Sequence, residues 1–217
     1  MQLRHWQVLL GQWRRAAEWL PADTHMCRPH SDLPPAGVTK RLSFTMIDAS
    51  KGTPMIQTLP LAPEDIPEKA AVHAQTWQET YRGLLPDELN DTITPQFAED
   101  VTRRLTSLRT LVAKIDGRIV GYISWSDRCR EHFSVDGAAE VGNLYVLREF
   151  QGRGVGRALL DAALRCIGER DVVLSAFSSN AAALGFYEHV GFVRTGVTFD
   201  EGPMEETELV FRHKSGT

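Results

Sequence analysis

The stretch LYVLREFQGRGVGRALL, residues 144–160, constrains the fold of this 217-residue chain more than any other. It begins as a short apolar run typical of a strand, passes through glycines at positions 152, 154 and 156, and continues with the apolar spacing of a helix. A strand that leads through glycines into a helix gathers several backbone N–H groups at the positive end of the helix dipole. Because glycine lets an anion approach the backbone closely, the stretch predicts a phosphate-binding loop.

The sequence motifs of two well-known phosphate-binding loops do not match this stretch. The P-loop needs a Gly-Lys pair followed by Ser or Thr, and the chain contains no such triplet. The dinucleotide fingerprint G-x-G-x-x-G, counted from Gly152, needs a small residue where Arg157 stands. The pattern that fits is Q-x-x-G-x-G, from Gln151 to Gly156.

Hydrophobic periodicity from Met55 onward predicts an ordered series of strands and helices. The expected elements are, in chain order, a strand at 55–61, helices over 61–86 and 93–108, a hairpin over 110–126, a strand at 138–146, a helix over 154–169, a strand at 171–177, a helix over 180–191 and a closing hairpin over 192–213. The first hairpin turns at Asp116-Gly117, a strong signal for a two-residue turn. The predicted order is therefore βααββ-βα-βα-ββ, in one domain that covers residues 55–217.

Residues 1–54 form an N-terminal extension to this pattern. Apolar residues recur at helical spacing from Leu3 until Pro21 stops them, and a linker rich in proline follows. The segment H-x-C-x-x-H from His25 to His30 has no fourth ligand nearby, so no metal site is expected.

Composition excludes several classes of function. A net charge of −4 and the absence of a block of Lys and Arg argue against a nucleic-acid partner. The three cysteines are widely separated and form no C-x-x-C pair, which argues against a disulfide framework or zinc site and favours the cytoplasm. No apolar stretch approaches the ~18 residues of a membrane span, so no membrane partner is expected, and a homodimer is left open.

A second motif, VVLSAFSSNAAALGFYEHVGFVRTG at 172–196, reads as strand, helix and strand. With both motifs in this order, the sequence resembles the GCN5-related N-acetyltransferase (GNAT) family from about Met55 to His213. The resemblance implies an α/β fold with a mixed, mostly antiparallel central sheet flanked by helices. It also implies that an acetyl group moves from acetyl-CoA to a primary amine by direct attack in a ternary complex, with no metal.

The same resemblance assigns residues to the coenzyme. The backbone of Leu144 and Val146 is expected to bind the pantetheine arm, and the loop from Gln151 to Gly156 the pyrophosphate. Asn180 is expected to bond the pantetheine amide, to cap its helix, or to do both. The full expected coenzyme set is Leu144, Tyr145, Val146, Gln151, Gly152, Arg153, Gly154, Val155, Gly156, Arg157 and Asn180. Arg157 has an equal alternative as an ordinary solvated helix residue.

Two residues are expected to move protons. Tyr187 occupies the place of the family's general acid, which would protonate the departing thiolate, and its alternative is a packed aromatic ring. Glu140, on the strand that enters the loop, is the first choice for the general base, acting through water, and its alternative is a surface glutamate. Glu79 and Glu188 are second choices for the base.

The acceptor pocket is expected between the first helices and the last hairpin. The substrate-binding residues expected there are Trp77, Tyr81, Phe199 and Glu201, with Arg82, Leu84, Asp200 and Glu205 beside them. Acidic residues in this position suit a cationic amine acceptor. Two other functions stay open, a non-catalytic acyl-CoA-binding module and, more remotely, a nucleotide-binding α/β protein.

Overall fold

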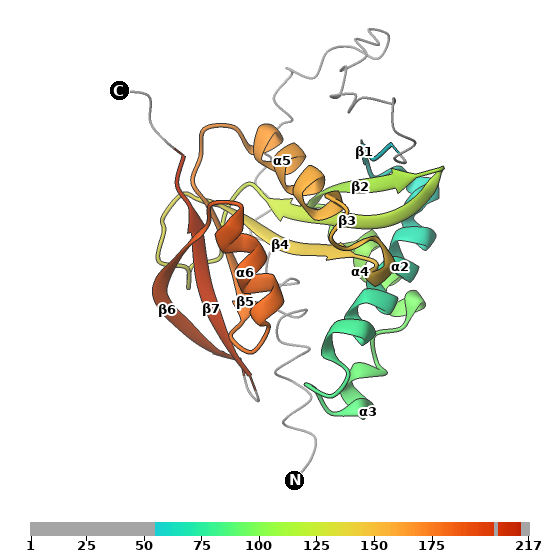
Figure 1. Ribbon diagram of the computed structural model, residues 1–217, viewed down its shortest axis with the longest axis horizontal. Coiled ribbons are helices and arrows are strands. Elements are labelled where there is room, and N and C mark those ends of the chain that lie inside the picture. The colour runs from blue at the N-terminus through green and yellow to red at the C-terminus, as the bar shows by residue number, and fades with distance from the viewer. Residues whose placement is uncertain (1–54, 202–203, 214–217) are drawn as a thin grey trace, which may run out of the picture.

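The computed structural model describes residues 55–201 and 204–213, which form one sheet with helices on both of its faces (Figure 1). The strands are β1 (Gln57–Pro60), β2 (Arg109–Ile115), β3 (Arg118–Ser126), β4 (Ala139–Val146), β5 (Val172–Phe177), β6 (Val193–Glu201) and β7 (Met204–Phe211). The helices are α2 (Ile66–Tyr81), α3 (Asp87–Asn90), α4 (Pro95–Arg104), α5 (Val155–Ile167) and α6 (Ala181–His189), with 3-10 turns η2 (Pro63–Asp65) and η3 (Arg148–Phe150).

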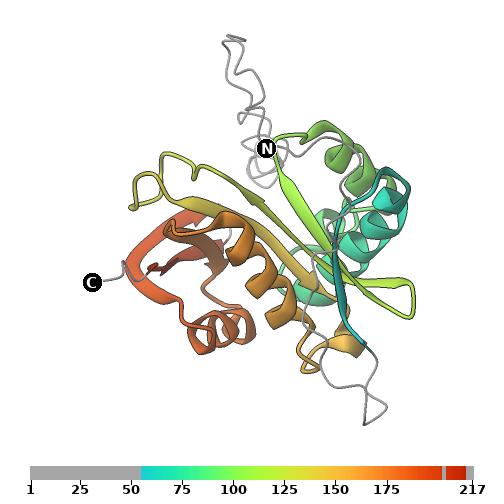
Figure 2. The ribbon, with the colours of Figure 1, turned by 90° about the horizontal axis from the view of Figure 1, so that it is seen from above.

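The described strands form a seven-stranded sheet in the order β1-β2-β3-β4-β5-β7-β6. Every neighbouring pair is antiparallel except β4 and β5, which are parallel. Helices α5 and α6 lie on one side of the sheet, here called the α5 face, and α2 and α4 lie on the other, the α2 face (Figure 2). The predicted fold class, a mixed and mostly antiparallel sheet flanked by helices, is confirmed.

The segment after β1 contains three helices, α2, α3 and α4, where periodicity predicts two. Prolines open both main helices, and α4 starts with a side-chain cap, in which Thr94 accepts a hydrogen bond of 3.1 Å from the backbone N–H of Phe97. The single helix expected over 61–86 ends at Tyr81, because Arg82 adopts an extended conformation. The short helix α3 follows Pro86 and was not predicted.

The central hairpin turns where the sequence predicts it. Asp116 and Gly117 both have positive φ, 51° and 82°, as a tight two-residue hairpin turn requires. The longer connection between β3 and β4 is fastened to the sheet by two glutamates. Glu208 accepts hydrogen bonds from the backbone N–H and the hydroxyl of Ser134, and Glu140 accepts bonds from Arg130.

A gap opens in the middle of the sheet between β4 and β5. The two strands pair only at their first residues, Ala139 with Val172 and Glu140 with Val173. Beyond Glu140, β4 keeps its antiparallel partner β3 up to Val146 but pairs with none of the described strands on its β5 side. The sheet therefore divides at this point, and the wide end of the gap lies where β4 passes into the predicted phosphate loop.

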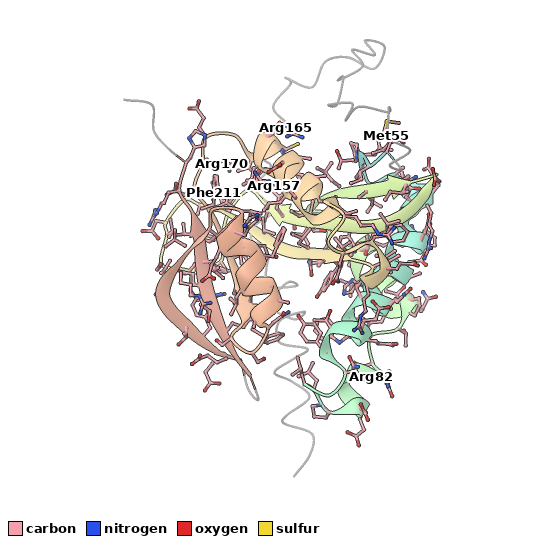
Figure 3. The ribbon with its side chains drawn as sticks, viewed as in Figure 1. Met55, Arg82, Arg157, Arg165, Arg170 and Phe211 are labelled. Atoms are coloured by element: carbon pink, nitrogen blue, oxygen red, sulfur yellow. The ribbon has the colours of Figure 1, made fainter. Side chains whose placement is uncertain are left out.

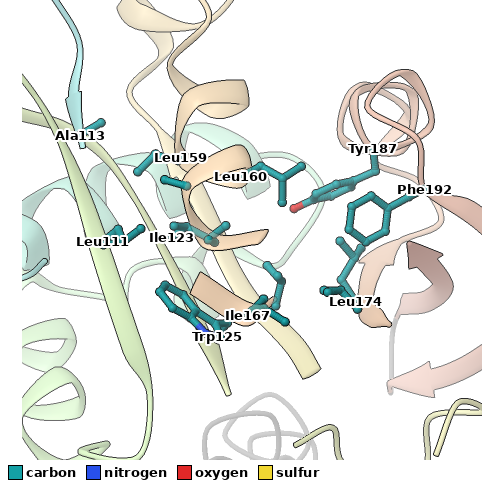
Figure 4. Close-up of a cluster of buried hydrophobic side chains, with 14 of the residues drawn as sticks. Leu111, Ala113, Ile123, Trp125, Leu159, Leu160, Ile167, Leu174, Tyr187 and Phe192 are labelled. Carbon is teal, nitrogen blue, oxygen red and sulfur yellow. The ribbon is translucent and has the colours of Figure 1, made fainter. Parts of the chain in front are cut away.

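The main core fills the α5 face. Buried side chains of α5, including Leu159, Leu160 and Ile167, pack against Ile123 and Trp125 of the sheet (Figure 4). A separate cluster on the α2 face joins the end of α2 to β5 and consists of Trp77, Tyr81, Leu85, Ile93 and Phe177. Because both clusters border the β4–β5 gap, the gap runs between two packed layers.

The N-terminal extension, its expected helix and the segment from His25 to His30 lie outside the described residues. None of the helices between residues 55 and 213 has the length and the apolar composition needed to cross a membrane.

Candidate active site

The predicted phosphate loop lies between the end of β4 and the start of α5. Leu147 is buried, the 3-10 turn η3 follows, and the backbone from Gln151 to Gly154 is exposed up to the first residue of α5. Gly152 and Gly154 have φ values of 70° and 84°, the left-handed region that favours glycine. A Cβ added at either glycine would meet no atom within 4 Å, so open space lies beside this backbone.

The first N–H groups of α5 follow this open stretch of backbone directly in the chain. Bonding from the helix to the loop begins with the N–H of Ala158, which donates to the carbonyl of Gly154 at 2.9 Å. The N–H groups of the three preceding residues, 155–157, have no carbonyl within the helix to bond. They lie at the positive end of the helix dipole, as an anion-binding site requires.

Side chains of the loop are held in three different ways. Gln151 closes the loop by donating from Nε2 to the carbonyl of Val146 at 3.0 Å. Arg153 lies over the ring of Phe150, with 5.5 Å between its guanidinium carbon and the ring centroid, at the rim of the loop. Arg157, on the first turn of α5 (Figure 3), is bonded at 2.9 Å to Asp161 one turn later.

Asn180 caps α6. Its Oδ1 accepts a hydrogen bond of 3.1 Å from the backbone N–H of Ala183, so the structural role expected for this residue is present. The amide nitrogen of Asn180 is not used in that bond and is left for the pantetheine role that the family resemblance implies.

The expected pantetheine edge is formed by the last three residues of β4. Leu144, Tyr145 and Val146 pair with β3 on one side and border the gap on the other. A bound chain can add to such an edge through its own amide groups.

A cavity of about 130 Å³ lies on the α2 face, beside this edge. It is lined by Trp77, Tyr81, Leu105, Leu108, Arg130, Glu140, Gly142, Asn143, Tyr145, Ser175, Ala176, Phe177 and Glu206. The structure therefore brings together four predicted site residues on α2 and β4 that were assigned to different roles: Trp77, Tyr81, Glu140 and Tyr145.

Aromatic rings form much of the cavity wall. The ring centroids of Trp77 and Tyr81 are 4.5 Å apart, and Phe177 meets Tyr81 edge-on at 5.3 Å. The indole Nε1 of Trp77 is buried and has no hydrogen-bond partner among the described residues. Burial raises the pKa of Tyr81 far above its usual value, a hydrogen bond with Tyr145 lowers it, and the charge of Glu206 raises it further. The phenol is therefore neutral at physiological pH.

The predicted base Glu140 is buried and ion-paired. Arg130 donates to its Oε1 from Nη2 at 2.6 Å and from Nε at 2.8 Å, and the backbone N–H of Arg130 donates to its Oε2 at 3.0 Å. Both carboxylate oxygens of Glu140 are therefore hydrogen-bonded to Arg130. The second choices lie elsewhere: Glu79 is exposed and accepts from Gln75, and Glu188 is exposed and paired with Arg194 at 2.6 Å.

A second carboxylate, Glu206 of β7, also lines the cavity and was not predicted. It is 6% exposed, and its Oε2 accepts a hydrogen bond of 2.6 Å from the hydroxyl of Ser175. The sequence did contain a signal. Strand alternation places Glu206 and Glu208 on the same face as the buried Val210, and two glutamates on the buried face of a strand need a structural or chemical partner.

The predicted acid Tyr187 approaches the gap from the opposite face. Its ring packs against Phe186 and Phe192 of the main core, and its hydroxyl points toward Leu160 of α5 (Figure 4). Burial raises the pKa of Tyr187, and the nearby phenol of Tyr81 raises it further.

Other predicted acceptor residues lie apart from the cavity. Phe199 of β6 packs edge-on against Phe133 and His132 of the β3–β4 connection. Glu201 ends β6, and its side chain is outside the described part. Arg82, at the end of α2 (Figure 3), pairs at the surface with Asp91 at 3.9 Å. His73 is buried, with its ring stacked 5.3 Å from that of Tyr145.

Among the described residues, no group of three or more His, Cys, Asp or Glu is placed to hold a metal ion. A central sheet that divides beside a glycine loop, with helices on both faces, is the arrangement that the GNAT resemblance of the sequence predicts.

Comparison with known proteins agrees with this prediction. Residues 106–194 match the model of the acetyltransferase (GNAT) domain. A probable N-acetyltransferase of Mycobacterium tuberculosis is 28% identical over 149 residues, which cover 65% of this chain and 82% of that protein. A mycothiol acetyltransferase of Cellulomonas flavigena is 38% identical over 101 residues, but these cover 43% of this chain and only 29% of that protein.

Solved structures share the fold. A histone acetyltransferase HPA2 and related acetyltransferase of Corynebacterium glutamicum superimposes with a TM-score of 0.60 and 22% identity, over 75% of this chain and 98% of that one. The PaiA N-acetyltransferase of Thermoplasma acidophilum, solved in complex with coenzyme A, gives 0.56 and 21%, over 71% and 98%. These similarities confirm the resemblance to the GNAT family that the two sequence motifs predicted.

Proposed function

We propose that this protein transfers an acetyl group from acetyl-CoA to a primary amine, by direct attack of the amine in a ternary complex. One observation carries the proposal: the exposed glycine loop and the start of α5 lie at the wide end of the β4–β5 gap, and a cavity with carboxylates borders the same gap. A thioester bound along β4 would thus have its phosphates on the loop and its acyl end beside the cavity.

The residues present fit coenzyme A. The N–H groups of residues 155–157 and the open space beside Gly152 and Gly154 suit a pyrophosphate. Arg153 supplies a cation at the rim, and the free edge of β4 at 144–146 suits the amides of a pantetheine arm. The coenzyme would supply the activated acyl group, and no covalent nucleophile of the protein is needed.

Proton transfer is assigned to groups on the two faces of the sheet. Tyr187, whose raised pKa keeps its phenol protonated, is the proposed donor to the departing sulfur. A carboxylate of the cavity, either Glu140 as predicted or Glu206, is the proposed acceptor of the amine's proton. We also propose that the reaction takes place in the cytoplasm, where the free thiols of Cys129 and Cys166 would stay reduced.

Calorimetry and a thiol-release assay test the proposal on the full chain. We expect acetyl-CoA to bind, NAD not to bind, and free coenzyme A to be released with at least one member of a panel of primary amines. Binding of acetyl-CoA without release by any amine would instead favour the non-catalytic module. Binding of NAD but not of acetyl-CoA would favour a nucleotide-binding protein.

A further inference from the structure

Two cavities meet at the turn between α4 and β2. The turn runs from Leu105 to Leu108, and the backbone N–H of Leu108 donates a hydrogen bond of 3.2 Å to the carbonyl of Leu105. Both leucines are half-buried, and both line the 130 Å³ cavity of the candidate active site, here called the acceptor cavity. They also line a larger cavity of about 450 Å³, here called the apolar cavity. The two cavities are therefore neighbours, and the side chains at their boundary are apolar.

The wall of the apolar cavity comes from the end of β1, the start of α2 and the neighbouring ends of β2 and β3. Besides the two leucines, its apolar lining residues are Pro60, Leu61, Pro63, Ile66, Leu111 and Trp125. Three threonines, Arg109 and Cys166 complete the lining. Leu111 and Trp125 also belong to the main core (Figure 4). A hydrocarbon chain gains stability on such a wall, because each methylene group leaves water.

The charged residues of the two cavities favour one orientation for a bound amine. The acceptor cavity is lined by two glutamates, Glu140 and Glu206, and by Arg130. The apolar cavity is lined by Arg109 and, among the described residues, by no acidic one. An ammonium ion is attracted to carboxylates and repelled by a guanidinium, so the amine end belongs in the acceptor cavity and an attached chain in the apolar cavity.

The volumes of the two cavities divide such a molecule unequally. The acceptor cavity has the space of about four water molecules at ~30 Å³ each, and the apolar cavity that of about fifteen. The acceptor cavity therefore has room for the amine and the few carbons next to it. The rest of a longer chain lies over Leu105 and Leu108 and in the apolar cavity.

On the basis of the proposed function, we infer that the acceptor is a primary amine on a long, unbranched alkyl chain, with its amine in the acceptor cavity and its chain in the apolar cavity. Transfer joins the amine nitrogen to the acetyl carbon and breaks the C–S bond. One proton of the neutral amine passes, in sum, to the departing sulfur, so the products are an N-alkylacetamide and coenzyme A. A lysine side chain suits this site less well, because its short arm is followed by a polar peptide backbone.

A series of amines of increasing length tests the inference on the full chain. The value of kcat/KM is measured by thiol release with n-butylamine, n-hexylamine and n-octylamine. We expect kcat/KM to rise about fourfold for each methylene added, which corresponds to the ~0.8 kcal/mol gained when one methylene is buried. A peptide whose only amine is one lysine side chain is assayed in parallel, and its kcat/KM should lie well below that of n-octylamine.

Two leucines near the end of β1 give a matched pair of variants. Leu61 lines the apolar cavity, whereas Leu59 is 39% exposed and lines neither cavity. We expect Leu61→Ser to lower the ratio of kcat/KM for n-octylamine to kcat/KM for n-butylamine about tenfold, and Leu59→Ser to leave this ratio unchanged. A smaller folded fraction would lower both values of kcat/KM equally, so the ratio reports on chain binding and not on stability.

A second pair of variants, in the turn between α4 and β2, keeps the inference testable if Leu61→Ser does not fold. Thr106 is exposed and lines the apolar cavity, and the next residue, Ser107, is exposed and lines neither cavity. Thr106→Lys adds a charge to the apolar wall and should lower the ratio of n-octylamine to n-butylamine. Ser107→Lys adds the same charge outside the wall and should leave the ratio unchanged.

The outcomes separate this inference from the proposed function. Release with n-butylamine that does not increase toward n-octylamine overturns the inference and leaves the proposed function intact. The same holds if the lysine peptide is acetylated faster than n-octylamine, or if the ratio is unchanged in Leu61→Ser and Thr106→Lys. No release from the unaltered protein with any amine overturns the proposed function and this inference with it.

Discussion

At the scale of single residues, Tyr187 is the position where a catalytic role and a packing role lead to the most different expected results. Its ring belongs to the main core, and its phenol is the proposed proton donor. Tyr187→Phe keeps the ring and deletes the proton, so we expect acetyl-CoA affinity to hold while the single-turnover rate falls about 100-fold. A single turnover is needed because product release can limit the steady-state rate.

The matched control for that variant is Tyr122→Phe. Tyr122 is also fully buried, and its hydroxyl has no hydrogen-bond partner among the described residues, so its loss should leave the turnover rate unchanged. Equal single-turnover rates in the unaltered protein and Tyr187→Phe would return Tyr187 to a purely structural role.

Lys69 makes the stability of the fold depend on pH. Its side chain is buried on α2, lies 4.1 Å from the centroid of the Tyr122 ring and donates to the hydroxyl of Thr102 at 2.9 Å. Burial lowers its pKa to about 7 from 10.5. Between these values the unfolded chain binds a proton that the folded chain has released, so this group raises stability as pH rises and lowers it as pH falls toward 7.

We therefore expect Lys69→Met to flatten the pH dependence of folding. Across pH 7 to 8.5, the slope of the unfolding free energy against pH should be lower in Lys69→Met than in the unaltered protein by up to about 1.4 kcal/mol per pH unit. Urea unfolding at several pH values measures this slope. If the slope is the same in both proteins, Lys69 is not neutralised by folding.

The sequence predicted the local structure of those expected site residues that belong to short motifs. The loop 151–156 and the cap Asn180 are set by short-range patterns of turn and helix chemistry, and both are found where they were expected. Glu206 and Arg130 were missed because each meets the cavity only through strand pairing and a long connection, which periodicity does not specify. The place of Phe199 under the β3–β4 connection depends on the same long-range packing.

At the scale of secondary-structure elements, α5 joins the core to the proposed coenzyme site. One face of the helix is buried through Leu159, Leu160 and Ala163, and its first turn follows the exposed loop. A helix fixed along its length by the core holds its N–H groups in a constant position, which is what binding a flexible pyrophosphate requires.

Glycines at the two ends of α5 allow this role to be tested. Gly154 precedes the helix with φ 84°, and Gly168 follows it with φ 80°. Valine at either position is strained by roughly 1–2 kcal/mol, so both variants should lower the melting temperature. Only Gly154→Val also places a branched side chain in the open space of the loop, so it alone should weaken acetyl-CoA binding by more than tenfold in calorimetry.

The control is decisive because the strain at Gly168 is at least as great. If Gly168→Val weakened the coenzyme equally, the effect would come from general destabilisation. If folded Gly154→Val bound acetyl-CoA with unchanged affinity, the loop would not be the phosphate site.

At the scale of the whole molecule, element order followed from the sequence but sheet order did not. Alternation and helical spacing give the series of strands and helices, because both depend on neighbours along the chain. The insertion of β7 between β5 and β6 depends on pairing across the sheet, as does the early parting of β4 and β5. The separation of β4 from β5 opens the gap in the sheet beside which the proposed active site lies.

The described domain contains every residue group of the proposed site except the side chain of Glu201. The glycine loop, both cavity carboxylates and Tyr187 lie between residues 140 and 206, and the sheet that holds them starts with β1 at Gln57. We therefore expect a shortened chain that begins at Met46 to fold, to bind acetyl-CoA with the affinity of the full chain, and to release coenzyme A at the same rate with the same amine. Calorimetry, thermal unfolding and the thiol-release assay on both chains make the comparison. A shortened chain that aggregates would show that apolar residues before Met46, Trp6 and Trp13 among them, cover exposed surface, because uncovered apolar patches promote association. A folded shortened chain that binds acetyl-CoA but has lost turnover would instead assign residues 1–45 to the acceptor side of the reaction.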